Sequence, residues 1–153
     1  MKSFYNINAL NKELQKQPKK KIVFTNGVFD IIHPGHIELF ECARASGDIV
    51  IVGINTDESI KRLKGDTRPV FPLEERMEIL GAIEFIDYII PFSEDTPLKL
   101  ISNLTRVDVL IKGGDYQPDQ VVGRKEVESA GGKLLLFQFQ SNYSTSKIIE
   151  KIK

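Results

Sequence analysis

The chain has 153 residues, of which 41% are hydrophobic, which suits one domain with a substantial core and is too short for two ordinary domains. Lys and Arg together number 21 and so do Asp and Glu, so a net charge of zero gives no electrostatic reason to expect binding to nucleic acid or to a membrane. The single cysteine, Cys42, excludes an internal disulfide, and no apolar run approaches the roughly 20 residues that span a bilayer. A cytoplasmic protein is therefore expected.

Apolar segments alternate with helical patterns along the chain. In chain order we predict a short helix within 5–17, a strand at 21–26, a helix at 34–47, a strand at 48–55, a helix at 72–83, a strand at 87–92, a helix at 97–104, a strand at 108–114, a polar helix around 123–130, a strand at 133–139 and a helix at 144–153. Pro34 suits the first turn of its helix, Gly47 its end, and Ser144 an N-cap. Residues 1–153 are expected to form a single domain, with 1–19 as a leader and 20–153 as its core.

The predicted strands are apolar at nearly every position, as strands buried on both faces are. Together with the strand-helix alternation, this pattern predicts an α/β fold: one Rossmann-like domain with a five-stranded parallel sheet and helices on both faces. Ligands of such sheets bind beyond the carboxyl ends of the strands. The residues that follow each strand are therefore the first candidates for a site.

Glycine, lysine, histidine and hydroxyl residues recur at these positions, and all are groups that bind phosphate. They are Asn26, Gly27, Val28, Phe29, Asp30, His33, Gly35 and His36 after the first strand, Lys61 and Lys64 after the second, Lys112, Gly113, Gly114, Asp115 and Tyr116 after the fourth, and Ser144, Thr145 and Ser146 after the fifth. The P-loop pattern G-x-x-x-x-G-K-[ST] is absent, and G-x-G-x-x-G does not follow the first strand. These absences argue against a P-loop kinase and an ordinary dinucleotide oxidoreductase.

The only two histidines of the chain, His33 and His36, stand three residues apart at the predicted start of a helix, with Gly35 between them. At this spacing their side chains can point the same way. Three interpretations stay open from the residues alone. The pair can belong to a metal site, which lacks a recognisable further ligand nearby; the two can be ordinary packed or capping residues; or they can donate hydrogen bonds to phosphate oxygens, helped by the helix dipole.

Several segments resemble a known family in order and spacing: "TNGVFDIIHPGH", "NTDESIKRLKGDTRPVFPLEERMEIL", "EDTP", "LIKGGDY" and "STSKIIEKI". The first is similar to the H-x-G-H signature of the nucleotidyltransferase superfamily, and the whole set resembles its ADP-heptose-forming adenylyltransferases. The resemblance implies transfer of AMP from ATP to a sugar 1-phosphate, D-glycero-β-D-manno-heptose 1-phosphate, for lipopolysaccharide core synthesis. It also implies Mg²⁺, a homodimer or higher homo-oligomer, and, for a chain that begins at Met1 without a fused sugar kinase, a separate heptose kinase.

The resemblance also implies roles for individual residues. His33, His36 and Lys64 are expected to be catalytic. Nucleotide binding is expected of Asn26, Gly27, Val28, Phe29, Gly35, Gly113, Asp115, Ser144, Thr145 and Ser146, and substrate binding of Asp30, Lys61, Arg76, Lys112, Gly114 and Tyr116. Lys61 is the alternative to Lys64 as the key lysine. Mg²⁺ is expected mainly on the nucleotide phosphates, with Asp30 as a candidate ligand or turn-capping residue. Arg76 has an alternative as a surface partner of Glu75 or Glu78.

Other functions are less favoured. A cytidylyltransferase for glycerol phosphate or a similar small alcohol phosphate is the alternative enzyme, but those enzymes carry Arg-Thr-Glu-Gly where this chain has Gln140-Ser141-Asn142-Tyr143. A nucleotide-binding module without catalysis is opposed by the intact H-x-G-H, Lys64 and Ser-Thr-Ser. An RNA-binding domain is opposed by the neutral charge and the lack of aromatic-basic motifs.

Overall fold

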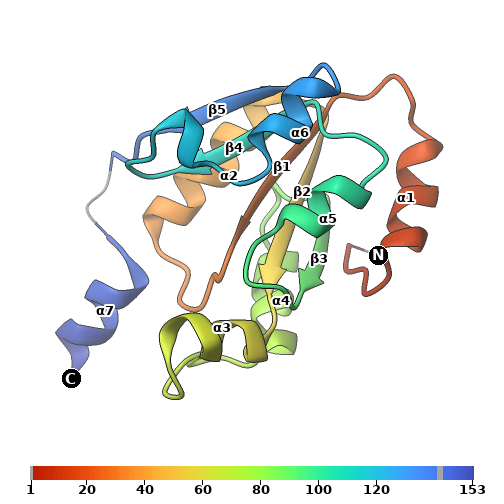
Figure 1. Cartoon of the computed structure of the whole chain (residues 1–153). Helices are drawn as coiled ribbons and strands as arrows, with labels where there is room; N and C mark the ends of the chain where they lie inside the picture. The colour runs from red at the N-terminus through yellow and green to blue at the C-terminus, as the bar shows by residue number, and fades with distance from the viewer. Residues whose placement is uncertain (1, 141–142) are drawn as a thin grey trace.

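The protein was examined as a computed structural model, which describes residues 2–140 and 143–153. One sheet of five parallel strands runs through it, and the strand order is β3-β2-β1-β4-β5 (Figure 1). The strands are β1 (Ile22–Gly27), β2 (Ile49–Asn55), β3 (Tyr88–Phe92), β4 (Val109–Gly113) and β5 (Lys133–Phe137). The predicted α/β fold with five parallel strands is confirmed. The order reverses beside β1, because β2 and β3 lie on one side of it and β4 and β5 on the other, and such a point is where α/β sheets bind ligands.

Helices cover both faces of the sheet. They are α1 (Ile7–Gln15), α2 (Pro34–Ser46), α3 (Asp57–Lys64), α4 (Leu73–Gly81), α5 (Leu98–Asn103), α6 (Arg124–Ser129) and α7 (Thr145–Ile152), with a short 3₁₀ helix η1 (Pro118–Gln120). Side chains of α1, α5 and α6 share one hydrophobic cluster with one face of the strands, and side chains of α2 and α4 share a second cluster with the other face. In the described part of the chain, no helix is long and apolar enough to cross a membrane.

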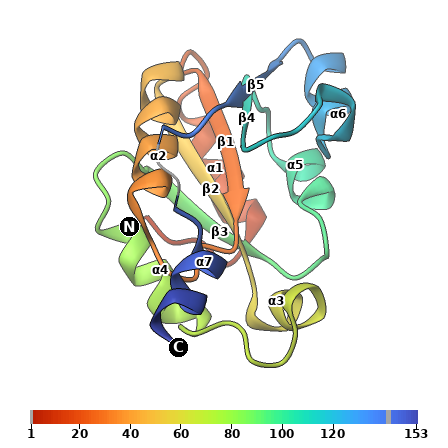
Figure 2. The ribbon, with the colours of Figure 1, turned by 90° about the vertical axis from the view of Figure 1, so that its left-hand side faces the viewer.

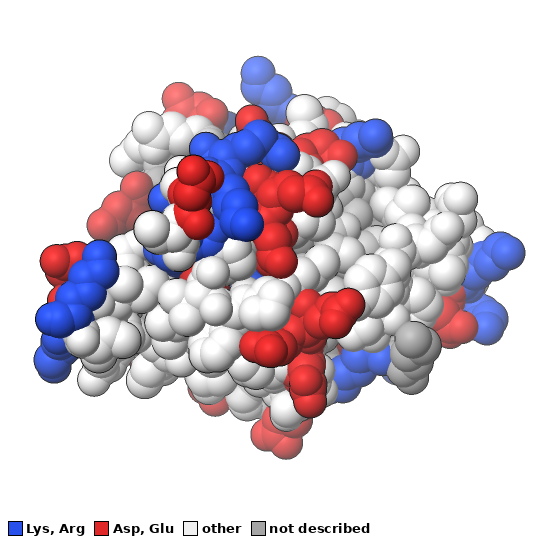
Figure 3. Space-filling view, turned by 90° about the horizontal axis from the view of Figure 1, so that it is seen from below, with Lys and Arg blue, Asp and Glu red and all other residues white. Residues whose placement is uncertain are grey.

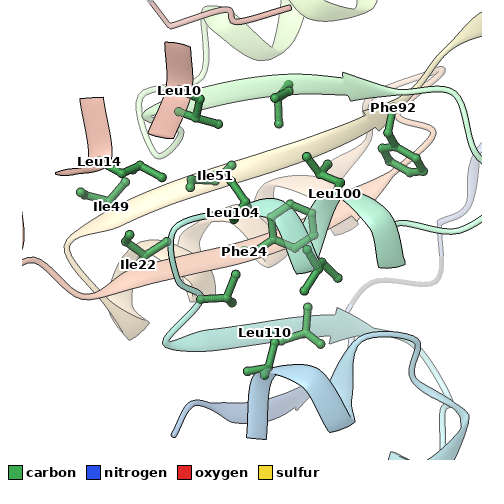
Figure 4. Close-up of a cluster of buried hydrophobic side chains, with 14 of the residues drawn as sticks. Leu10, Leu14, Ile22, Phe24, Ile49, Ile51, Phe92, Leu100, Leu104 and Leu110 are labelled. Carbon is green, nitrogen blue, oxygen red and sulfur yellow. The ribbon is translucent and has the colours of Figure 1, made fainter. Parts of the chain in front are cut away.

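Alternation along the strands supplies both clusters. In β1, Ile22 and Phe24 belong to the first cluster, whereas Val23 between them belongs to the second. Figure 4 shows the first cluster, in which the side chains of Leu10 and Leu14 from α1 pack over the strands. All residues of β2 are buried, which explains why the sequence there is continuously apolar.

The segment before residue 20 packs against the sheet. The N–H of Phe4 donates to the carbonyl of Ile89 at 2.9 Å, and the N–H of Ile89 donates to the carbonyl of Lys2 at 2.9 Å, so this segment extends along β3. Leu10 and Leu14 are 0% exposed. The apolar face of α1 therefore packs on one face of the sheet and belongs to the same hydrophobic cluster as the strands.

One helix was not predicted. Residues 57–64, for which the sequence predicted neither helix nor strand, form α3. The hydroxyl of Thr56 caps this helix by accepting the N–H of Ser59 at 3.3 Å, and Asp57 and Glu58 occupy its first turn, where the helix dipole favours acidic side chains. The capping residue Thr56 can be recognised in the sequence. The helix was not predicted, because most of its residues are polar and too few are apolar to show a clear helical spacing.

Candidate active site

An open cavity of about 560 Å³ lies at the carboxyl ends of β1 and β4, at the edge where the strand order reverses. This volume is ordinary for a site that binds a small ligand. Most predicted site residues line it: Asn26, Gly27, Val28, Phe29, His33, His36, Lys64, Lys112, Gly113, Tyr116, Ser144, Thr145 and Ser146. Segments that are far apart in the sequence thus meet around one space, as the parallel sheet predicted.

The turn after β1 forms the floor of the cavity. Phe29 has a left-handed φ of 50°, unusual for a bulky residue, and its ring is 4% exposed. A Cβ on Gly27 would lie 2.8 Å from that ring, so only glycine fits there. The Phe29 ring also packs edge-on against the imidazole of His36, with centroids 5.2 Å apart. The turn therefore holds the backbone close to the cavity and supports the second histidine from below.

The two histidines cap the start of α2 through their own ring nitrogens. Nδ1 of His33 accepts the N–H of Gly35 at 3.1 Å, and Nδ1 of His36 accepts the N–H of His33 at 3.2 Å. The rings stack with centroids 3.7 Å apart. Because each Nδ1 lone pair already accepts a backbone N–H, each neutral ring carries its proton on Nε2. The arrangement supplies two N–H donors at one end of the cavity.

Both histidines are uncharged at neutral pH. Burial, followed by the neighbouring His33, lowers the pKa of His36 from 6.5 to about 3. Burial also lowers the pKa of His33, although the carboxylate of Glu38 acts in the opposite direction. The positive end of the α2 dipole disfavours a cation here as well. The capping interpretation is confirmed, because Nδ1 of each ring accepts a backbone N–H at the start of α2. Donation to phosphate stays a prediction, for which Nε2 of each ring remains available.

Three basic side chains contribute to the lining of the cavity. Lys64, Arg68 and Lys112 line it, and the one carboxylate among the described lining residues, Asp95, accepts Nε of Arg62 at 2.9 Å. Burial lowers the pKa of Lys112, whose ammonium lies 5.0 Å from the centre of the Tyr116 ring. Seen from this edge, the outer surface carries mixed basic and acidic groups (Figure 3). Basic side chains therefore outnumber acidic ones among the described lining residues, although Asp30, beneath the cavity, is paired with Arg68.

The start of α7 reaches the same turn. The hydroxyl of Thr145 donates to the carbonyl of Ile31 at 3.1 Å, and the hydroxyl of Ser144 accepts the N–H of Lys147 at 3.1 Å as the predicted N-cap. Hydroxyls and first-turn N–H groups of a helix are suitable donors to phosphate. In the connection that precedes α7, Gln140 donates its N–H to Glu38 at 3.0 Å, whereas Ser141 and Asn142 lie outside the described residues.

Asp30 does not line the cavity, and its carboxylate is bonded within the protein. It is 1% exposed, and its carboxylate accepts Nε of Arg68 at 2.9 Å, the N–H of Val70 at 2.8 Å and the N–H of Phe71 at 2.9 Å. Burial alone would raise the pKa of Asp30, but these donors more than offset it and hold the pKa below its usual value. Both oxygens are occupied, so Asp30 does not fit a Mg²⁺ ligand. It ties the turn after β1 to the segment between α3 and α4.

Arg76 lies beneath the cavity and not on the protein surface. It is 1% exposed, and its guanidinium donates to the carbonyls of Phe71 at 2.9 Å, Val28 at 2.9 Å and Asn55 at 2.8 Å, and to the carboxylate of Asp57 at 2.6 Å. The alternative of a surface pair with Glu75 or Glu78 is therefore wrong. Arg76 also does not line the cavity, so its predicted contact with the acceptor has no support here; it joins the ends of β1 and β2 to α3.

Four further residues that were predicted to belong to the site do not line the cavity: Lys61, Gly114, Asp115 and Gly35. Lys64 lines the cavity whereas Lys61, one turn earlier on α3, does not, which favours Lys64 as the site lysine. Gly114 has a φ of 114° and bends the chain after β4, so Asp115 is exposed away from the lining. Gly35 is buried, and its N–H already serves His33. Arg68 also lines the cavity but was not predicted as a site residue. It lies in the segment "NTDESIKRLKGDTRPVFPLEERMEIL", where nothing in the sequence around it indicates a ligand.

The fold is a parallel α/β sheet with a cavity at its switch point, and the chain belongs to the Cytidylyltransferase-like family, whose model matches residues 24–151. It is 51% identical over 138 residues to the "Bifunctional protein HldE" of Sodalis glossinidius (strain morsitans), covering 90% of this chain and 28% of the relative. It is 54% identical over 133 residues to the protein of the same name from Citrifermentans bemidjiense, covering 87% and 27%. The predicted resemblance to H-x-G-H nucleotidyltransferases is confirmed, and the chain spans little more than a quarter of these relatives' length.

Two solved structures have the same fold. A lipopolysaccharide core biosynthesis protein from Thermoplasma volcanium GSS1 is 25% identical, with a TM-score of 0.64, over 82% of this chain and 99% of that protein. A pantoate-beta-alanine ligase from Francisella tularensis is 20% identical, with a TM-score of 0.65, over 99% of this chain and 77% of the ligase. The second likeness concerns the fold alone.

Proposed function

We propose that this chain transfers AMP from ATP to a sugar 1-phosphate and releases pyrophosphate. The observation that carries the proposal is the pair of neutral Nε2–H donors at the start of α2, opposite the basic side chains of the same cavity. Together with the family membership, it favours phosphoryl chemistry over acyl or redox chemistry. By resemblance, the acceptor is D-glycero-β-D-manno-heptose 1-phosphate and the product is ADP-heptose for lipopolysaccharide core synthesis.

The chemistry needs positioning more than a reactive side chain. An anionic oxygen of the sugar phosphate attacks the α-phosphorus of ATP, a new P–O bond forms, and the bond to the β-phosphate oxygen breaks, so pyrophosphate leaves with the electron pair. The nucleophile is already ionised, so no general base is required. In the proposal, Nε2–H of His33 and His36 donate to phosphate oxygens where charge develops, and Lys64 lies between donor and acceptor phosphates.

The remaining assignments follow from position. The turn Asn26–Phe29 is proposed to contact the nucleoside, Lys112 and Tyr116 the sugar, and Ser144–Ser146 the triphosphate. Mg²⁺ is proposed to arrive on the ATP phosphates, because the described residues contain no group of three metal-ligating side chains and Asp30 is occupied. A cytoplasmic location, a homodimer or higher homo-oligomer, and supply of the substrate by a heptose kinase also remain proposals.

The test is pyrophosphate release with Mg²⁺ under matched conditions. Heptose 1-phosphate with ATP is expected to give pyrophosphate and an ADP-sugar of the matching mass. The same acceptor with CTP, and glycerol 3-phosphate with either nucleotide, are expected to give little. Release with CTP and glycerol 3-phosphate would instead support the cytidylyltransferase alternative, and release in none of the four mixtures would contradict the proposed reaction.

A further inference from the structure

Arg68 is a cavity residue with no role in the account so far. It stands in the segment between α3 and α4, lines the cavity beside Lys64, and its side chain is 12% exposed. Its Nε donates to Asp30 at 2.9 Å, while its two Nη groups donate to no acceptor in the described part of the chain. A guanidinium this deeply placed with four N–H bonds to spare, at the edge of a cavity, is suited to bind an anion.

Asp30 fixes the guanidinium in place. Its own side chain is 0% exposed and is held by the N–H groups of Val70 and Phe71 as well as by Arg68. Asp30 also follows directly on Phe29, whose ring supports His36. Two contacts therefore fix the position of Arg68 relative to the histidine pair: the ion pair of Arg68 with Asp30, and the packing of Phe29 against His36.

The ion pair with Asp30 offsets much of the charge of Arg68. Binding of an anion by Arg68 therefore depends more on directed hydrogen bonds from its Nη groups than on its net charge. A planar guanidinium can hold a carboxylate through one edge and present another edge to a phosphate, which a lysine ammonium cannot do in the same geometry. Lys64, by contrast, is exposed on the end of α3. The two cations thus differ, because Lys64 is exposed whereas Arg68 is mostly buried and held by Asp30.

The position of Arg68 in the cavity indicates which of the two substrates it binds. The donor triphosphate, in the proposed function, is served by the starts of α2 and α7. Figures 1 and 2 show α3 and α7 on different sides of the lower end of the sheet, and Arg68 comes from the chain that leaves α3. Resting on the proposed function, we infer that Arg68 binds the phosphate group of the acceptor and sets it against the α-phosphorus.

The kinetic test compares Arg68→Lys with the wild-type chain and with Arg124→Lys. Arg124 is a matched control, because its Nε also donates to a carboxylate at 2.9 Å, that of Glu128, on α6 and outside the cavity lining. Loss of the fixed fork is expected to raise KM for the sugar 1-phosphate about tenfold or more, with KM for ATP within about twofold and the control unchanged. An unchanged acceptor KM, or an ATP KM that rises in step with it, would overturn the inference.

A binding test separates this inference from the proposed function. Inorganic phosphate is titrated by calorimetry into each protein saturated with α,β-methylene ATP, so that the donor position is filled and no turnover is needed. Weaker phosphate binding by Arg68→Lys than by Arg124→Lys and wild type is expected. Equal binding in all three, or none in the wild type, would refute the role of Arg68 even if turnover were found, whereas absent turnover with normal phosphate discrimination would refute only the reaction.

Discussion

Replacing His36 with alanine is expected to lower kcat by about a hundredfold to a thousandfold, the usual effect of removing one donor to a developing oxyanion. The ring supplies an Nε2–H donor to the cavity because its Nδ1 accepts the N–H of His33 at 3.2 Å. Alanine has no hydrogen-bond donor in its side chain, so at this position only water could stabilise the charge that develops on the phosphate oxygens in the transition state. Initial rates of pyrophosphate release at saturating substrates, compared with Glu41→Ala on an exposed position of the same helix, measure the effect.

The His36→Ala protein is expected to fold. The variant loses a capping contact of α2, which typically costs about 1 kcal/mol of unfolding free energy. Far-UV circular dichroism and a thermal transition close to that of the wild type would show that the loss of rate is not a loss of structure. A well-folded His36→Ala protein with wild-type kcat would remove the histidine from the chemistry.

Arg76→Met is expected to be the most damaging change for stability, at about 3 kcal/mol, in the range for breaking one partner out of a buried ionic network. Methionine keeps much of the volume but none of the N–H donors, so the carbonyls of Val28 and Asn55 lose their partner in a buried place. Asp57 is 37% exposed at its side chain and can turn to water, which keeps the cost at the lower end. Urea unfolding measures the change.

Asp57→Asn is the control for this network. It removes the charge pair but leaves the donors of Arg76 on their three carbonyl acceptors, so about 1 kcal/mol or less is expected. If Asp57→Asn were as destabilising as Arg76→Met, the ion pair and not the carbonyl contacts would hold the turn. If neither variant changed the unfolding free energy, the structural role given to Arg76 would be wrong.

The fold could be predicted because its strongest signals are local. The continuously apolar β2 and the helix start at Pro34 follow from composition and spacing. Residues that follow parallel strands gather at one edge of the sheet whatever their detailed conformation, so most of the predicted site residues do line the cavity. The buried charges were not, because Asp30 meets the N–H of Val70 40 residues away and Arg76 meets Asn55 21 residues away. The sequence does not show whether an Asp or Arg side chain contacts a ligand or is hydrogen-bonded within the protein beneath the site.

The histidine pair also sets a pH dependence. The pKa of His36 is about 3 in the folded chain against 6.5 for an ordinary histidine, so between these values the unfolded chain takes up a proton that the folded chain does not. This group therefore favours unfolding increasingly as pH falls below about 6.5, and it contributes no such effect above that pH. The sign is opposite to that of a histidine that gains an acidic partner on folding.

The proposed reaction depends on both rings being uncharged Nε2–H donors, and ¹⁵N NMR of the imidazoles tests this most directly. The chain has only two histidines, so their signals are separable. At pH 7 both rings are expected to be neutral, with the proton on Nε2 and an unprotonated Nδ1. His36 is expected to stay neutral down to pH 5 and to show no titration near 6.5. A ring that titrates with a pKa near 6.5, or that carries its proton on Nδ1, would contradict the account of how this site holds phosphate.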